Sequence, residues 1–252
     1  MKSIKFQGFQ SEPIESNHSD IFMNNLEANM IREGVVILPE RIFKDVVDVK
    51  LITEIIQRLS EVSKHVILIA GSILVSDSGQ LYNRSYVFQR GKLLGYQDKL
   101  VPFSRERSRI SPGRVIKIFE LSGFSFAVAI CYDIDFPFFA KISAINGANV
   151  IFNPSLIRHD FHKEWHQYIK SRSLENRMSV VSVNSNGSSF KGDSIFVSPY
   201  EESDAIRIEV EEFRNMDNFQ STLFKHDVSG KFEQRISEDP GIYSFPIKKI
   251  IN

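Results

Sequence analysis

Two stretches of the chain follow the same order of local structure, and this repetition limits the fold more than any other feature. Residues 24–40, NNLEANMIREGVVILPE, run from an amphipathic segment through Gly34 into the apolar run VVIL and then to a glutamate. Residues 138–155, FFAKISAINGANVIFNPS, repeat this order with Gly147, the run NVIF and an asparagine. A helix that ends at a left-handed glycine and leads into a strand buried on both faces explains both stretches. The pattern predicts an α/β fold.

Three further stretches indicate what surrounds these strands. Residues 51–62, LITEIIQRLSEV, have the apolar spacing of an amphipathic helix, and residues 160–179 have it again, with Asp160 as the expected N-cap. Residues 76–103 alternate apolar and polar side chains and carry a glycine at each of two turn positions. This alternation predicts antiparallel hairpins, so we expect the sheets to be mixed.

Length and composition limit the class of protein. The 252 residues, 42% hydrophobic and 25% charged, suit one large domain spanning residues 1–252. The 31 basic side chains equal the 31 acidic ones, which argues against nucleic acid or an anionic membrane as a partner. The run VILIAGSILV is too short to cross a bilayer, and the polar start lacks a signal-peptide core. Together with the single cysteine, this predicts a cytoplasmic protein.

Polar residues follow three of the predicted buried strands. Glu40 comes after VVILP, Cys131 after FAVAI, and Asn153 after NVIF. In open α/β sheets, ligands bind beyond the carboxyl ends of the strands. We therefore expect these three side chains to approach one binding site.

Cys131 has no second cysteine with which to form an internal disulfide. It is either a small buried hydrophobic residue or a nucleophile presented at the end of a strand. A thiol has an ordinary pKa of about 8.5, so a nucleophilic cysteine needs a base or a cation beside it. Glu40 is the candidate base and Lys99, in YQDKLVPF, the candidate cation. Lys99 and the backbone N–H of Tyr132 are the candidate donors to an oxyanion.

Five motifs in this order, LPE, YQDKLVPF, ICYDIDFP, NPS and RSLEN, resemble those of the carbon-nitrogen hydrolase family, also called the nitrilase superfamily. The resemblance extends through GDSIFVSP at residues 192–199 and into the closing stretch 226–247. It implies a four-layer α-β-β-α sandwich of two mixed β-sheets with helices on the outer faces, and it implies neither a metal nor an organic cofactor. It also implies hydrolysis of a non-peptide C–N bond, with Glu40 as base, Lys99 as oxyanion cation and Cys131 as nucleophile.

The resemblance suggests roles for further residues. Glu106, between two arginines in PFSRERSRISPG, is the candidate for a second acid at the site. Asn153 and Ser155 either cap a turn after their strand or line the pocket. A buried network that holds a helix near the site is the role suggested for Arg172, Glu175 and Asn176. Residues 201–222 depart from the family pattern and are interpreted as an atypical insert.

Two other features have competing interpretations. The string HKEWH places two histidines one helical turn apart, but Lys163 stands where a zinc-protease helix has glutamate, so we do not expect a metal. The basic loop is formed by Arg105, Arg107, Arg109 and Arg114, which either form a solvated face or bind an acidic group of a substrate.

The favoured function is hydrolysis of a small linear amide through a cysteine thioester, with release of ammonia or an amine. Nitrilase and N-acyltransferase activity are the alternatives within the family. A catalytically idle scaffold or binding domain is the alternative from another class. The resemblance also implies a homodimer or a larger homo-oligomer, with a small molecule as substrate.

Overall fold

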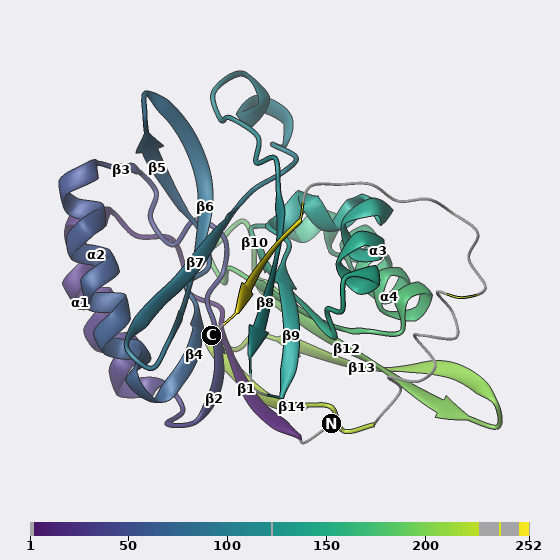
Figure 1. The fold of residues 1–252 in the computed structure, drawn as a ribbon. Helices are drawn as coiled ribbons and strands as arrows, with labels where there is room; N and C mark the ends of the chain where they lie inside the picture. The colour runs from purple at the N-terminus through teal and green to yellow at the C-terminus, as the bar shows by residue number, and fades with distance from the viewer. Residues whose placement is uncertain (1–2, 122, 227–236, 238–246, 252) are drawn as a thin grey trace.

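Two mixed β-sheets form the centre of the molecule (Figure 1). The structure is a computed structural model, and it describes residues 3–121, 123–226, 237 and 247–251. Within these residues, the strands of the first sheet lie in the order β14 (Asn218–Leu223), β1 (Ile4–Phe9), β2 (Gly34–Ile37), β4 (Val66–Ile69), β6 (Gln80–Gln89), β5 (Ile73–Asp77) and β3 (Val46–Val47), with β7 (Lys92–Asp98) paired to β6. Those of the second lie in the order β13 (Ala205–Arg214), β12 (Gly192–Glu202), β11 (Ser179–Asn184), β10 (Val150–Ser155), β9 (Phe124–Val128), β8 (Ile116–Leu121) and β15 (Ile247–Ile251).

Helices cover the outer faces of both sheets, as Figure 1 shows. The first sheet carries α1 (Ser19–Asn29) and α2 (Val49–Val62), and the second carries α3 (Pro137–Ile145) and α4 (His162–Asn176). The expected four-layer α-β-β-α sandwich is therefore confirmed. The helix predicted at residues 51–62 is α2, which begins after Asp48 because that carboxylate accepts hydrogen bonds from the first backbone N–H groups of the helix.

Aromatic side chains join the two sheets across the middle of the sandwich. Phe6 of β1 packs edge to face on Phe196 of β12, with ring centroids 5.0 Å apart. On the second sheet, Phe126 of β9 lies 5.2 Å from Phe152 of β10, centroid to centroid. All four rings are buried in one hydrophobic cluster that draws on both sheets. This packing fixes the position of one sheet relative to the other.

Two local predictions were wrong. Gly34 does not end a helix, because α1 stops at Asn29 and Gly34 is instead the first residue of β2, with φ +113°. A Cβ there would lie 2.2 Å from the backbone oxygen of Lys5, so glycine allows β2 to approach β1 closely. Asp160 does not cap α4, because its carboxylate pairs with Arg158 and the helix begins two residues later.

The predicted hairpins at residues 76–103 are β5, β6 and β7, which pair antiparallel. Residues 201–222, interpreted as an insert, lie in strands that join both sheets. They contain the end of β12, all of the antiparallel strand β13 and most of β14, which pairs with β1 of the first sheet. The segment thus extends the second sheet at its edge before it crosses to the first.

The remaining predictions concern the ends of the chain and the membrane. Most of the closing stretch 226–247 lies outside the described residues. In the described part of the chain, no helix combines the length and apolar character that crossing a membrane requires.

Candidate active site

Glu40, Lys99 and Cys131 meet although they come from different parts of the chain. Glu40 follows β2, Lys99 follows β7 of the same sheet, and Cys131 follows β9 of the opposite sheet. Nζ of Lys99 lies 2.8 Å from Oε1 of Glu40, and both charges act on the pKa of the Cys131 thiol, which Glu40 raises and Lys99 lowers. Their exposed fractions are 2%, 1% and 6% in chain order. The carboxylate is therefore paired with the ammonium near the sulfur, in a site shielded from water.

Cys131 sits in a strained turn. It is the first residue of a 3-10 helix (Cys131–Asp135) and has a backbone φ of 48°. A positive φ is unfavourable for a residue with a side chain, so its surroundings must hold it there. Asn153 contributes from β10, because its Nδ2 donates to the backbone oxygens of Cys131 at 3.2 Å and of Ala129 at 2.7 Å. The turn thus presents the sulfur at the end of the sheet.

Asp133 ties the cysteine turn to the loop after β7. Its buried carboxylate accepts hydrogen bonds from the backbone N–H groups of Leu100 at 3.0 Å, Val101 at 2.8 Å and Ile130 at 3.0 Å. The sequence analysis did not single out this residue. An acid two positions after the cysteine, in CYDIDFP, was the available signal. Asp133 fixes the distance between the loop that carries the lysine and the turn that carries the sulfur.

Glu106 also contacts Lys99. Its Oε2 lies 2.8 Å from Nζ of Lys99 and accepts a hydrogen bond from the backbone N–H of Phe103 at 2.8 Å. A short 3-10 helix (Ser104–Ser108) turns this glutamate inward, while Arg105 and Arg107 on either side of it are exposed. The candidate second acid is thus in contact with the candidate cation.

Asn83 is another residue that the sequence analysis missed. It lies in β6, is fully buried, and donates from Nδ2 to Oε1 of Glu40 at 2.8 Å. The backbone N–H of Glu40 donates to the backbone oxygen of Ser155 at 3.2 Å. One of these bonds holds the carboxylate of Glu40 and the other holds its backbone. Sequence carried no signal for Asn83, because a polar residue in an alternating strand is usually expected to face solvent.

The electrostatics of the site favour a neutral thiol and a charged lysine. Burial and the neighbouring Glu40 carboxylate raise the pKa of Cys131 well above its usual value, against the opposing effect of Lys99. Burial disfavours the charge on Lys99, but Glu40, the Cys131 sulfur and Glu106 outweigh it and raise the pKa of the ammonium. A nucleophilic Cys131 would therefore need a base at the moment of attack, and Glu40 is the carboxylate that acts on the pKa of its thiol.

Asn153 and Ser155 lie inside β10 and are fully buried, so they do not cap a turn beyond the strand. Ser155 Oγ donates to Oδ1 of Asn153 at 2.8 Å, which orients the amide that supports the cysteine turn. The ring of Tyr132 packs on that of Phe103, with ring centroids 4.9 Å apart. The backbone N–H of Tyr132 comes before the first backbone hydrogen bond of the 3-10 helix Cys131–Asp135.

Comparison with known proteins settles the family. The sequence model of the carbon-nitrogen hydrolase family matches residues 46–202. The chain belongs to the carbon-nitrogen hydrolase family. A hydrolase encoded in the agr operon of Staphylococcus aureus is 30% identical over 205 residues, which cover 73% of this chain and 77% of that protein. A 2-oxoglutaramate amidase of Bacillus subtilis is 31% identical over 143 residues, 53% of this chain and 54% of that one.

The fold has relatives among solved structures as well. A carbon-nitrogen hydrolase superfamily protein of Xanthomonas campestris superposes with a TM-score of 0.75 at 18% identity, covering 97% of this chain and 100% of that one. At this identity the likeness shows the fold alone. Glu40 lies before the residues that the family model matches, so its assignment to the site of this carbon-nitrogen hydrolase depends on its ion pair with Lys99 and its effect on the pKa of Cys131.

In this carbon-nitrogen hydrolase, Arg172 joins α4 to the cysteine turn. Its Nε donates to the backbone oxygen of Ile134 at 3.0 Å, and its second guanidinium nitrogen donates to that of Asp135 at 2.7 Å. Glu175 and Asn176 extend the contact, because the Glu175 carboxylate accepts from both Arg172 and Asn176. The three residues therefore form a network, in which Arg172 and Asn176 are buried but the Glu175 side chain is 40% exposed.

The basic loop faces outward. All four of its arginines, at positions 105, 107, 109 and 114, are exposed, whereas Glu106 among them is half-buried. The structure therefore does not place these guanidinium groups against Lys99 or Cys131. Whether they bind an acidic group of a substrate stays a prediction.

Proposed function

We propose that this protein hydrolyses a small linear amide through a thioester on Cys131. The observation that carries the proposal is the buried ion pair of Glu40 with Lys99, whose two charges both act on the pKa of the buried Cys131 thiol. A base and a cation beside a sulfur are what a cysteine nucleophile needs.

The first half-reaction forms the thioester. Glu40 takes the thiol proton while the sulfur bonds to the amide carbon, and the negative oxygen that develops is stabilised by Lys99 and the Tyr132 N–H. The C–N bond then breaks, and Glu40 returns the proton to the departing nitrogen, which leaves as ammonia or an amine. Because Lys99 stays charged beside two carboxylates, it acts through its charge and transfers no proton.

The second half-reaction releases the acid. Glu40 takes a proton from water, the resulting oxygen nucleophile attacks the thioester carbon, and the C–S bond breaks. The sulfur recovers its proton from Glu40, which restores the neutral thiol that burial favours. One carboxylate thus serves both halves of the cycle.

Amide substrates are supported by a relative whose name states that activity, the 2-oxoglutaramate amidase of Bacillus subtilis. A nitrilase and an N-acyltransferase are the alternatives within the family, and the substrate panels below distinguish them from an amidase. We also propose a cytoplasmic homodimer or larger homo-oligomer acting on a small molecule, which size-exclusion chromatography with light scattering would test for the assembly.

The first prediction concerns this chemistry. Purified protein incubated with panels of small amides and nitriles should release ammonia from amides and should gain the mass of the acyl group on its single cysteine. Cys131→Ala and Glu40→Gln should each lower the rate by about a thousandfold or more while the circular dichroism spectrum stays unchanged. Glu40→Gln removes the base but keeps the local structure, because its amide oxygen still accepts a hydrogen bond from Lys99.

Three outcomes would contradict the proposal. Ammonia release by Cys131→Ala would exclude the sulfur as nucleophile. Turnover of nitriles with none of amides would favour a nitrilase, and product formed only when an amine acceptor is added would favour acyl transfer.

A further inference from the structure

Asn83 is a buried residue that contacts both the candidate base and the backbone of the candidate cation. Its Nδ2 donates to Oε1 of Glu40 at 2.8 Å, and its backbone oxygen accepts from the backbone N–H of Lys99 at 2.9 Å. An ionised carboxylate only accepts hydrogen bonds, so the nitrogen of the Asn83 amide must be the atom that faces Glu40. The amide oxygen therefore takes the other position.

The amide oxygen of Asn83 is left without a donor. In the part of the chain that the structure describes, Oδ1 is shielded from solvent and accepts no hydrogen bond. A buried acceptor without a donor costs free energy, and such a group in a folded protein calls for a specific partner. Because Oδ1 and Nδ2 belong to one planar amide group, this unpaired acceptor lies directly beside the base.

The alternation of side chains along β6 shows which way Asn83 points. Val87 belongs to the hydrophobic cluster between the sheets, which also contains Cys131, whereas Tyr86 and Phe88 belong to the cluster beneath α1 and α2. Side chains an even number of residues apart lie on the same face of a strand, so Asn83 faces the same way as Val87. The unpaired oxygen therefore lies on the face of the first sheet that is turned toward the sheet carrying Cys131.

The proposed chemistry needs an acceptor in this position. When the C–N bond breaks, Glu40 gives a proton to the departing nitrogen, and the N–H groups already on that nitrogen point elsewhere. In a site shielded from water these N–H groups need acceptors of their own. Oε1 of Glu40 and Oε2 of Glu106 each already accept two hydrogen bonds. Oδ1 of Asn83 is a buried acceptor next to Glu40 that has its full capacity left.

We propose that Asn83 is a substrate-binding residue, whose Oδ1 accepts a hydrogen bond from the N–H of the amide that Cys131 attacks. The inference rests on the proposed function, because it assigns a contact to the leaving nitrogen of that reaction. It narrows the substrate class to amides that carry at least one hydrogen on nitrogen. Neither an ester nor an N,N-dialkyl amide can donate to Oδ1.

The test compares the primary amide that the protein hydrolyses fastest with the methyl ester of the same acid. Both form the same thioester and both leaving groups take a proton from Glu40, so a change in the ratio of the two kcat/KM values isolates the N–H contact. Asn83→Leu removes the acceptor at similar volume and should lower kcat/KM for the amide about tenfold more than for the ester. Asn83→Asp keeps an acceptor and, as the protonated acid, a donor to Glu40, so its ratio should stay within about twofold of the parent's.

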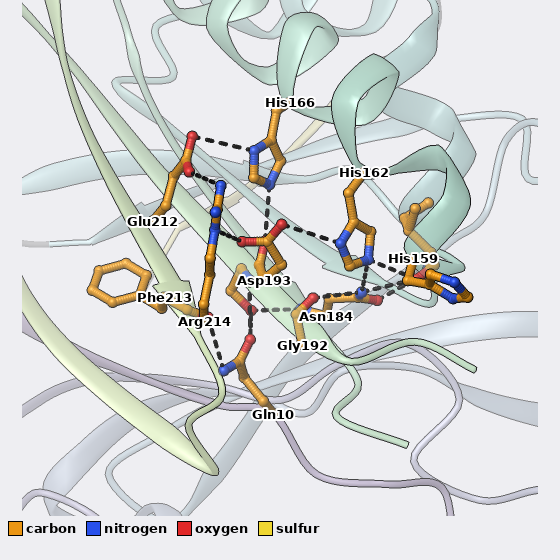
Figure 2. A network of polar contacts seen from close by, with 12 residues as sticks. Gln10, His159, His162, His166, Asn184, Gly192, Asp193, Glu212, Phe213 and Arg214 are labelled. Atoms are coloured by element: carbon orange, nitrogen blue, oxygen red, sulfur yellow. Dashed lines mark hydrogen bonds and ion pairs between the residues drawn. The ribbon is translucent and has the colours of Figure 1, made fainter. Parts of the chain in front are cut away.

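Two control variants separate this contact from loosened packing. Ser85→Ala alters the next side chain on the same face of β6, whose hydroxyl is also buried without a partner among the described residues. Asn184→Leu repeats the Asn83 substitution at a fully buried asparagine of the other sheet, whose Nδ2 donates to the Gly192 oxygen at 2.8 Å within the polar network of Figure 2. Both variants should keep the parent's ratio of amide to ester hydrolysis, even where their stability falls.

The inference is overturned if Asn83→Leu lowers the two kcat/KM values equally, or if Ser85→Ala shifts their ratio as much as Asn83→Leu does. Circular dichroism checks that each variant is folded. If Asn83→Leu is not, Asn83→Ser, which is smaller and polar, takes its place and should shift the ratio in the same direction. A parent that hydrolyses no amide would contradict the proposed function and this inference together, whereas an active amidase with an unchanged ratio would contradict this inference alone.

Discussion

At the scale of single residues, the site consists of a carboxylate paired with an ammonium near a sulfur, with backbone groups around them. Asp133 is the residue that most depends on its surroundings. It is fully buried and accepts three backbone N–H bonds, yet burial raises its pKa to about 7 against those donors and Lys99. It therefore exchanges a proton within the range in which the protein would work.

Asp133 leads to a prediction about stability and pH. Between about pH 4 and pH 7 the folded protein retains a proton on this carboxyl that the unfolded chain has lost, so the free energy of unfolding should fall as pH rises. The slope contributed by one such group is at most about 1.4 kcal/mol per pH unit. Asp133→Asn should lack this contribution. Urea unfolding of both proteins from pH 5 to pH 8 measures it.

The free energy of unfolding is compared between the two proteins at each pH, so the contributions of other titrating groups cancel in the difference. The parent should lose stability relative to Asp133→Asn as pH rises. A difference that stays constant across this range would mean that Asp133 is ionised throughout in the folded state.

At the scale of elements, the close pairing of β1 and β2 depends on a single glycine. Gly34 and Gly147 both have positive φ, +113° and +88°, but their surroundings differ. A Cβ at Gly34 would meet the Lys5 backbone, which belongs to β1 and cannot move aside cheaply, whereas a Cβ at Gly147 would meet open space. The two positions therefore separate the cost of backbone conformation from the cost of steric contact.

Gly147→Ala should destabilise the protein by about 1 kcal/mol, the cost of the left-handed conformation alone. Gly34→Ala should cost about 3 kcal/mol or more, because β2 must also move away from β1. The free energy of unfolding in urea measures both. Equal losses for the two variants would show that the close approach of β1 and β2 does not constrain position 34.

At the scale of the whole molecule, the candidate site exists only while the two sheets are packed together. Glu40 and Lys99 come from the first sheet and Cys131 from the second, and Phe6 against Phe196 is one of the contacts that join them. Loosening this packing should therefore affect stability and chemistry together.

Phe6→Ala should lower the free energy of unfolding by about 3–5 kcal/mol, because it leaves a cavity between the sheets. Hydrolysis of an amide should be lost in the same urea range as secondary structure. Phe161→Ala is the control, since that ring is 55% exposed and its loss should cost under about 0.5 kcal/mol. Activity that disappeared well before unfolding would show that the site opens without separation of the sheets.

The sequence allowed most of the fold to be predicted and only part of the candidate site. Apolar runs and their spacing gave the buried strands, the helix α2 and the hairpins of β5 to β7. The errors at Gly34 and Asp160 arose because glycine serves a close strand contact as well as a helix end, and because an acid can pair with a neighbouring arginine instead of capping. Both choices depend on neighbours in space.

The sequence by itself determined which residue types follow the buried strands. Because the apolar runs define these strands, Glu40 and Cys131 come after the carboxyl ends of their strands in any fold that keeps them. The tertiary structure decided which groups meet. Lys99 and Glu40 are 59 residues apart, and Asn83 carries no local pattern that marks it. The physical reason is that a strand or helix is specified by spacing over a few residues, whereas a hydrogen bond across two sheets exists only after both have packed.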